Sequence, residues 1–120
     1  MEYRYEVVAP FCAVLSKEPP ANSVALAGYR ESISLFVCPM QPEQSRVWFR
    51  LAVADDQSSD QALRDFQDRI FMQDRPVLES QTPRCLPLAP EAERHSAADK
   101  ASSMYRRHLR NLGASFGVIP

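Results

Sequence analysis

The strongest constraint on how this chain folds is a change in hydrophobic period near residue 55. Before that point, apolar residues alternate with polar ones or form short aromatic and β-branched runs, which predicts antiparallel strands. The strands are expected at about residues 3–7, 11–16, 32–40 and 45–54, with a weaker one at 24–26. Pro42-Glu43-Gln44 separates the last two strands and predicts a hairpin with a loop of about four or five residues.

After residue 55 the apolar positions recur three and four residues apart, which predicts an amphipathic helix of about twenty residues. Ser58 or Ser59 is the expected N-cap. Pro76 lies inside the pattern and predicts a kink or a break near Gln73. The face of this helix that carries the recurring positions consists of Leu63, Phe66, Ile70, Phe71, Asp74, Val77, Leu78 and Gln81.

A proline-rich stretch, residues 82–90, then predicts extended chain, and a last helix is expected from about Ser96 to Leu112. Gly113 is a natural residue to end that helix. Its outer side is expected to carry Arg106, Arg107 and Arg110, as a solvated face or as partners for Glu91 and Glu93 and for another subunit. The predicted class is therefore α+β: a curved antiparallel sheet, a long helix and a C-terminal helix.

Composition excludes several classes of function. With 14 Lys and Arg against 15 Asp and Glu, the formal net charge of -1 gives no general attraction to nucleic acid or anionic lipid. Three widely spaced cysteines, without a C-x-x-C pair, argue against a disulfide framework and against a zinc or cluster site. The N-terminus does not have the pattern of a secretory signal, so we expect a cytoplasmic protein with reduced thiols.

Asp74 is the most informative single residue. On a helical period it falls among Ile70, Phe71, Val77 and Leu78, so it is expected to point with the apolar stripe toward the sheet. An unpaired buried carboxylate is costly. It could be neutral, it could pair with a sheet arginine such as Arg46 or Arg50, or it could bind a metal.

The residues from Ile70 to Gln81 resemble the helix that supplies the carboxylate ligand in Rieske-type non-haem iron oxygenases, particularly the vanillate O-demethylase-like group. The similarity extends upstream to the hairpin and downstream to the C-terminal helix. It includes Arg46-Val47-Trp48-Phe49-Arg50, Pro83, Leu86-Pro87-Leu88, Asp99-Lys100-Ala101-Ser102 and Tyr105-Arg106-Arg107-His108-Leu109.

The resemblance implies the C-terminal portion of a helix-grip catalytic domain, in which two histidines and one carboxylate hold Fe(II). Asp74 matches that carboxylate, and Glu79 is implied to support the ligand or the helix from outside the coordination sphere. Phe36, Val47 and Phe49 are candidates to line an apolar substrate pocket, or else pack as ordinary core. The complete enzymes also carry a [2Fe-2S] Rieske cluster, receive electrons from a reductase and commonly form trimers.

Two parts of the family pattern are missing from these 120 residues. No C-x-H and C-x-x-H pair is present for a cluster, and no D-x-x-H-x4-H segment for iron. His95 and His108 do not match the metal motif. The chain alone is therefore expected to be inactive, either as a truncated reading frame or as the distal half of an enzyme completed by another chain.

The parent reaction implied is hydroxylation or O-demethylation of an aromatic or similarly apolar substrate. A metal-free helix-grip module that binds an apolar ligand is the alternative. Ligand binding that survives without metal and without Asp74 would favour that module.

Overall fold

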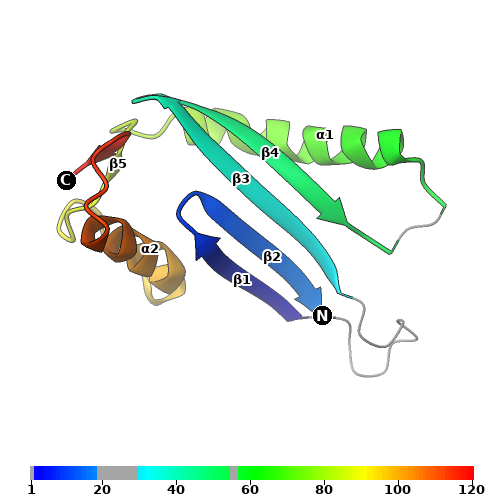
Figure 1. Cartoon of the computed structure of the whole chain (residues 1–120), viewed down its shortest axis with the longest axis horizontal. Coiled ribbons are helices and arrows are strands. Elements are labelled where there is room, and N and C mark those ends of the chain that lie inside the picture. The colour runs from blue at the N-terminus through cyan, green and yellow to red at the C-terminus, as the bar shows by residue number, and fades with distance from the viewer. Residues whose placement is uncertain (1, 19–29, 55–56) are drawn as a thin grey trace. The chain divides into compact units, whose positions relative to one another are not determined.

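The computed structural model describes residues 2–18, 30–54 and 57–120, and the weak strand expected at 24–26 lies outside these ranges. The chain forms two compact units, Ala54–Arg84 and the remainder, Met1–Val53 with Cys85–Pro120. Each unit is treated separately below. The order of elements confirms the predicted α+β class (Figure 1).

The larger unit is built on a four-stranded antiparallel sheet in the order β1-β2-β3-β4 (Figure 1). Its strands are β1 (Glu2–Ala9), β2 (Cys12–Glu18), β3 (Glu31–Gln41) and β4 (Gln44–Ala52). All four strands agree with the alternation in the sequence. The β3–β4 turn is tighter than predicted: Gln41 pairs with Gln44, so only two residues form the turn.

The sheet has one strongly apolar face, because residues directly opposite each other in an antiparallel ladder point to the same side. We call this the apolar sheet face. It carries Tyr3, Tyr5 and Val7 of β1, Ala13 and Leu15 of β2, Ile33, Leu35 and Val37 of β3, and Val47, Phe49 and Leu51 of β4. The opposite face is mixed and includes Arg4, Glu6, Phe36, Arg46 and Trp48.

The smaller unit consists mainly of α1 (Asp60–Glu79). The N-cap of the helix is Ser59, whose hydroxyl accepts a hydrogen bond from the Ala62 N–H at 3.2 Å. This confirms one of the two residues predicted as the N-cap. Of the two alternatives expected near Gln73, a kink or a break, the break is wrong, because α1 continues through Pro76 to Glu79. Pro76 lies in the last turn, where its fixed φ fits a helix and only one backbone donor is lost.

The C-terminal segment returns to the larger unit. A 3₁₀ turn, η1 (Ala97–Asp99), leads into α2 (Lys100–Asn111), and Gly113 follows with a φ of +69° as predicted. The short strands β5 (Leu86–Pro87) and β6 (Val118–Ile119) pair in parallel. Leu88 and Leu109 are the fully buried side chains among the described residues, and they form the centre of this part of the core.

Tyr105 ties α2 to the turn between β1 and β2. Its hydroxyl accepts a hydrogen bond from the Phe11 N–H at 3.1 Å. Phe11 has a φ of +63°, a conformation that is costly for a residue with a side chain. The Phe11 carbonyl in turn accepts a hydrogen bond from the Val37 N–H at 2.9 Å. Both backbone groups of this unfavourable residue are therefore satisfied by other elements.

Replacing Tyr105 by phenylalanine should lower the free energy of unfolding by about 1–2 kcal/mol, because the half-buried Phe11 N–H loses its acceptor. Urea unfolding, followed by circular dichroism, measures the change. Tyr3→Phe is the matched control, since Tyr3 is 52% exposed and the same oxygen is removed. Equal midpoints for the two variants would show that the hydrogen bond does not contribute.

Candidate functional site

Asp74 lies on α1 on the side that also carries Ile70, Phe71, Val77 and Leu78, as the helical period predicts. None of the α1 residues Asp60–Glu79 is buried. Within the described part of Ala54–Arg84, Asp74 accepts no hydrogen bond and forms no ion pair. Its carboxylate is therefore not committed to a partner on its own helix and can act as a ligand. That it turns toward the sheet stays a prediction.

Glu79, by contrast, has a partner on the same helix. The Nε of Arg75 lies 2.8 Å from its Oε1, which is an i, i+4 ion pair spanning Pro76. Exposed pairs of this kind stabilise a helix by about 0.3–0.5 kcal/mol. Glu79 therefore supports the last turn of α1, next to the turn that carries Asp74. Its role around a bound metal stays a prediction.

The three candidate pocket residues do not share one side of the sheet. Val47 and Phe49 are both on the apolar sheet face and both are half-buried, opposite Val37 and Leu35 respectively. Phe36 lies opposite Trp48 on the other face and is exposed. A single pocket on one face can therefore use Val47 and Phe49 but not Phe36.

The register adds further wall residues that the sequence analysis did not single out: Ile33, Leu35 and Val37. The signal for them was present, since these three aliphatic residues alternate with Ser34 and Phe36 in the sequence.

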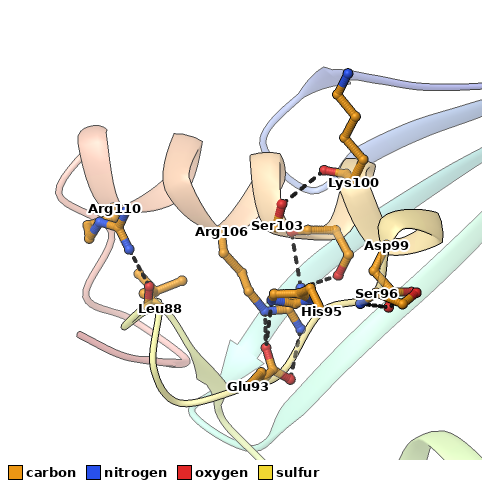
Figure 2. A network of polar contacts seen from close by, with 10 residues as sticks. Leu88, Glu93, His95, Ser96, Asp99, Lys100, Ser103, Arg106 and Arg110 are labelled. Carbon is orange, nitrogen blue, oxygen red and sulfur yellow. Dashed lines mark hydrogen bonds and ion pairs between the residues drawn. The ribbon is translucent and has the colours of Figure 1, made fainter.

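The two histidines, His95 and His108, both lie in the larger unit. The Nε2 of His95 is 3.9 Å from the Oε2 of Glu93, in the loop before α2 (Figure 2). His108 is exposed on the last turns of α2. Across the residues that the structure describes, no three His, Cys, Asp or Glu side chains are grouped so that they could hold a metal.

A polar cluster joins the loop before α2 to the helix (Figure 2). The Arg106 guanidinium forms an ion pair with Glu93, donates from Nη2 to Glu93 Oε1 at 3.1 Å and from Nη1 to the Ser102 carbonyl at 3.2 Å. The expectation that Arg106 points outward is wrong, since only 16% of its side chain is exposed. The pairing with Glu93, which was the other expectation for these arginines, is confirmed. Arg110 also contacts the loop, donating to the Leu88 carbonyl at 2.5 Å.

Asp99 caps the start of η1 in the same cluster. Its carboxylate accepts hydrogen bonds from the backbone N–H and the hydroxyl of Ser96, both at 2.8 Å. These bonds favour the ionised form and lower the pKa of Asp99, with a smaller contribution from the nearby His95. The cluster is a structural clamp that fixes the first turn of α2.

Arg106→Met should lower the free energy of unfolding by about 1–3 kcal/mol, because Glu93 then keeps a partly buried charge without its partner. Arg107→Met is the control on the neighbouring, exposed position and should shift stability by less than about 0.5 kcal/mol. Replacing Glu93 by leucine together with Arg106→Met should recover part of the loss, because no unpaired charge remains. Thermal unfolding of the four proteins tests all three statements, and a double variant weaker than Arg106→Met would contradict the ion-pair explanation.

The fold and the sequence together place the chain in a family of oxygenase domains. The chain belongs to the vanillate O-demethylase oxygenase C-terminal domain family, whose model matches residues 1–115. This confirms the family indicated by the helix around Asp74 and by the segments that flank it.

Two named proteins are similar in sequence to this chain. The chain is 40% identical over 118 residues to the probable methylxanthine N7-demethylase NdmC of Pseudomonas sp. (strain TJI-51), an alignment that covers 98% of this chain. It is 36% identical over 75 residues, 62% of this chain, to the methylxanthine N1-demethylase NdmA of Pseudomonas putida. The chain spans 40% of the length of NdmC, and its alignment with NdmA covers 20% of that protein. No helix in the described residues has the length and apolar character needed to cross a membrane.

Proposed function

We propose that this chain supplies Asp74 as the carboxylate ligand of a mononuclear Fe(II) centre in an oxygenase that demethylates a small aromatic substrate. The observation that carries the proposal is the match to an oxygenase C-terminal domain over residues 1–115, with 40% identity to NdmC across nearly the whole chain. Asp74 supports it as an uncommitted carboxylate on the long helix.

The residues present supply one ligand of three. Oxygen-activating Fe(II) sites use two histidines and one carboxylate on one face of the metal, and leave the other positions open. The unit Ala54–Arg84 contains no histidine in its sequence. When bound, the iron would provide the activation of O2. Because His95 and His108 do not match the metal motif of the family, this proposal takes both imidazoles from polypeptide outside these 120 residues and assigns no catalytic step to this chain alone.

In this proposal the ligands of the [2Fe-2S] cluster also come from polypeptide outside these 120 residues. A Rieske cluster requires two cysteines and two histidines in closely spaced pairs. Cys12, Cys38 and Cys85 are far apart in the sequence, and none has a histidine two or three residues away. Electrons would reach the iron from a cluster carried elsewhere and fed by a reductase.

The substrate class follows from the relatives and from the sheet. NdmC and NdmA are methylxanthine demethylases by name, so we extend a methylxanthine or a similar planar aromatic molecule to this chain. A ring of that kind would be held by apolar contacts, for which Val47, Phe49, Leu35 and Val37 offer a continuous patch of the apolar sheet face. The proposal therefore favours N-demethylation, the activity in the names of both relatives, over the expected hydroxylation or O-demethylation.

Complementation tests the proposal. NdmC lacking the region that aligns with this chain would be co-expressed with this chain, and the purified complex assayed for iron content and for methylxanthine consumption in the presence of reductase. We expect the pair to retain iron and to consume substrate, while the shortened NdmC alone does neither. A complex that forms without iron and without turnover would refute the proposal. Binding of methylxanthine by this chain alone, without metal, would favour the apolar-ligand module instead.

A further inference from the structure

The turn between β1 and β2 carries an aromatic residue at a position whose backbone favours glycine. Ala9 pairs with Cys12, so the turn consists of Pro10 and Phe11. Phe11 has a φ of +63°. A turn with proline first and a positive φ second favours glycine or asparagine in the second position, because a Cβ atom is crowded there. The turn itself therefore does not account for a phenylalanine.

The hydrogen bonds around Phe11 do not account for its ring either. Its N–H donates to the hydroxyl of Tyr105 at 3.1 Å, and its carbonyl accepts from the Val37 N–H at 2.9 Å. Both bonds use backbone groups that glycine or asparagine would also supply. Phe11 is half-buried, whereas the fully buried side chains of the described residues are Leu88 and Leu109. A ring kept at a strained position, outside the centre of the core, points to a functional contact.

The β-ladder places Phe11 beside the patch that we assign to the substrate. In the β2–β3 ladder Ala13 lies opposite Leu35, and the hydrogen bond from Val37 to Phe11 continues that ladder by two residues. Val37 in turn lies opposite Val47 on β4. Phe11 therefore lies at the border of the patch, in one row across the sheet with Val37 and Val47.

We propose that Phe11 is a specificity-determining residue of the oxygenase, whose ring contacts the planar substrate at the border of this patch. The inference rests on the proposed function and adds to it an aromatic contact that selects a flat heterocycle. Aromatic rings attract each other in offset or edge-to-face arrangements, in addition to the effect of the apolar surface that they bury. Because hydrogen bonds hold the Phe11 backbone on both sides, the ring is in place before the substrate binds.

Phe11→Asn tests the reason for the strained aromatic residue, because asparagine fits the turn but cannot replace an aromatic contact. In the chain alone, the urea midpoint should stay the same or rise, since relief of the strained φ offsets the loss of a half-buried ring. In the complemented complex, KM for an N7-methylated xanthine should rise about 5- to 20-fold, while kcat changes by less than about twofold. A ring that only packs would give the opposite pattern: a lower midpoint, less complex and an unchanged KM.

Two further variants isolate the ring from its bulk. Phe11→Tyr keeps the ring and should hold KM within about twofold of the unmodified complex. Phe11→Leu keeps the strained backbone and an apolar side chain but has no ring, and its KM should rise as in Phe11→Asn. Phe116→Asn is the matched control and should leave KM unchanged, because Phe116 also lies in a turn and is 53% exposed.

The KM of Phe11→Leu decides the inference. If the unmodified complex holds iron and turns over, and KM is the same with Phe11→Leu, the role of Phe11 is refuted while the proposed function stands. If the unmodified complex has neither iron nor turnover, both are refuted. A rise in KM with Phe11→Leu, together with an unchanged KM for Phe116→Asn, supports the aromatic contact.

Discussion

Replacing Asp74 by alanine should remove iron from the complemented oxygenase, and demethylation with it. Loss of an outer hydrogen-bonding partner of a metal ligand already costs roughly 10- to 100-fold in metal affinity, so loss of a ligand should cost more than about 100-fold. With only two imidazoles left, the three-ligand face is incomplete. Iron per complex, measured by plasma mass spectrometry after desalting, should fall to the level of the shortened NdmC without this chain.

Asp65→Ala is the matched control for that experiment. Asp65 lies nine residues before Asp74 on α1, which places it half a turn round the helix at 100° per residue. It is exposed and accepts a hydrogen bond from Gln61 at 2.8 Å, and its replacement by alanine removes the same charge as Asp74→Ala does. The control should retain iron and activity. Equal iron content in the Asp74 and Asp65 variants would show that Asp74 is not a ligand.

A structural role for Asp74 would give a different pattern. Loss of a buried contact would lower the thermal stability of the complex whether or not iron is present. Loss of a ligand should lower it only for the iron-loaded form, since a bound metal stabilises the state that binds it. Melting temperatures measured with and without Fe(II) therefore distinguish the two roles.

Much of the local structure could be predicted because its causes are local. The strand alternation, the cap at Ser59 and the end of α2 at Gly113 depend on residues within a few positions of each other. The family likewise followed from short strings around Asp74. What the helix period indicated about Asp74 itself, an orientation toward the sheet, stays a prediction.

The positions of the pocket candidates could not be predicted, because they depend on pairing across the hairpin. Val47 and Phe49 share a face by their spacing within one strand, but the face of Phe36 relative to them is set by the length of the turn at Pro42 and Glu43. A shift of one residue in the register moves every side chain of a strand to the other face. The expected loop of about four or five residues did not fix that register.

Contacts between residues far apart in the sequence could not be predicted from local patterns either. Nothing around Phe11 indicates that its unfavourable φ is held by the hydroxyl of Tyr105, 94 residues later. The parallel pairing of Leu86 with Val118 involves strands of only two residues, which are too short to show a period. Arg106 was expected outside because helical spacing alone does not show that the preceding loop folds over it.

Leu109→Ala should give the largest loss of stability in the chain, about 2–5 kcal/mol in the free energy of unfolding. Leu109 and Leu88 are each only 1% exposed, and they are the fully buried side chains among the described residues. Truncation of the side chain leaves a cavity. Because few side chains in this core are fully buried, few neighbours can move in to fill it. Because a domain of this size is stable by only about 5–15 kcal/mol, a large part of its stability would be lost.

Leu112→Ala is the control for Leu109. It lies three residues later, just after α2, loses the same three carbon atoms, and is 57% exposed. Its effect should be within about 0.5 kcal/mol, because most of the removed surface already contacts water. Urea unfolding of the two variants, with the slope of the transition compared as well as its midpoint, separates a weaker core from a change in the unfolded state. If Leu112→Ala proved as damaging as Leu109→Ala, the burial of Leu109 would not be what stabilises the C-terminal segment.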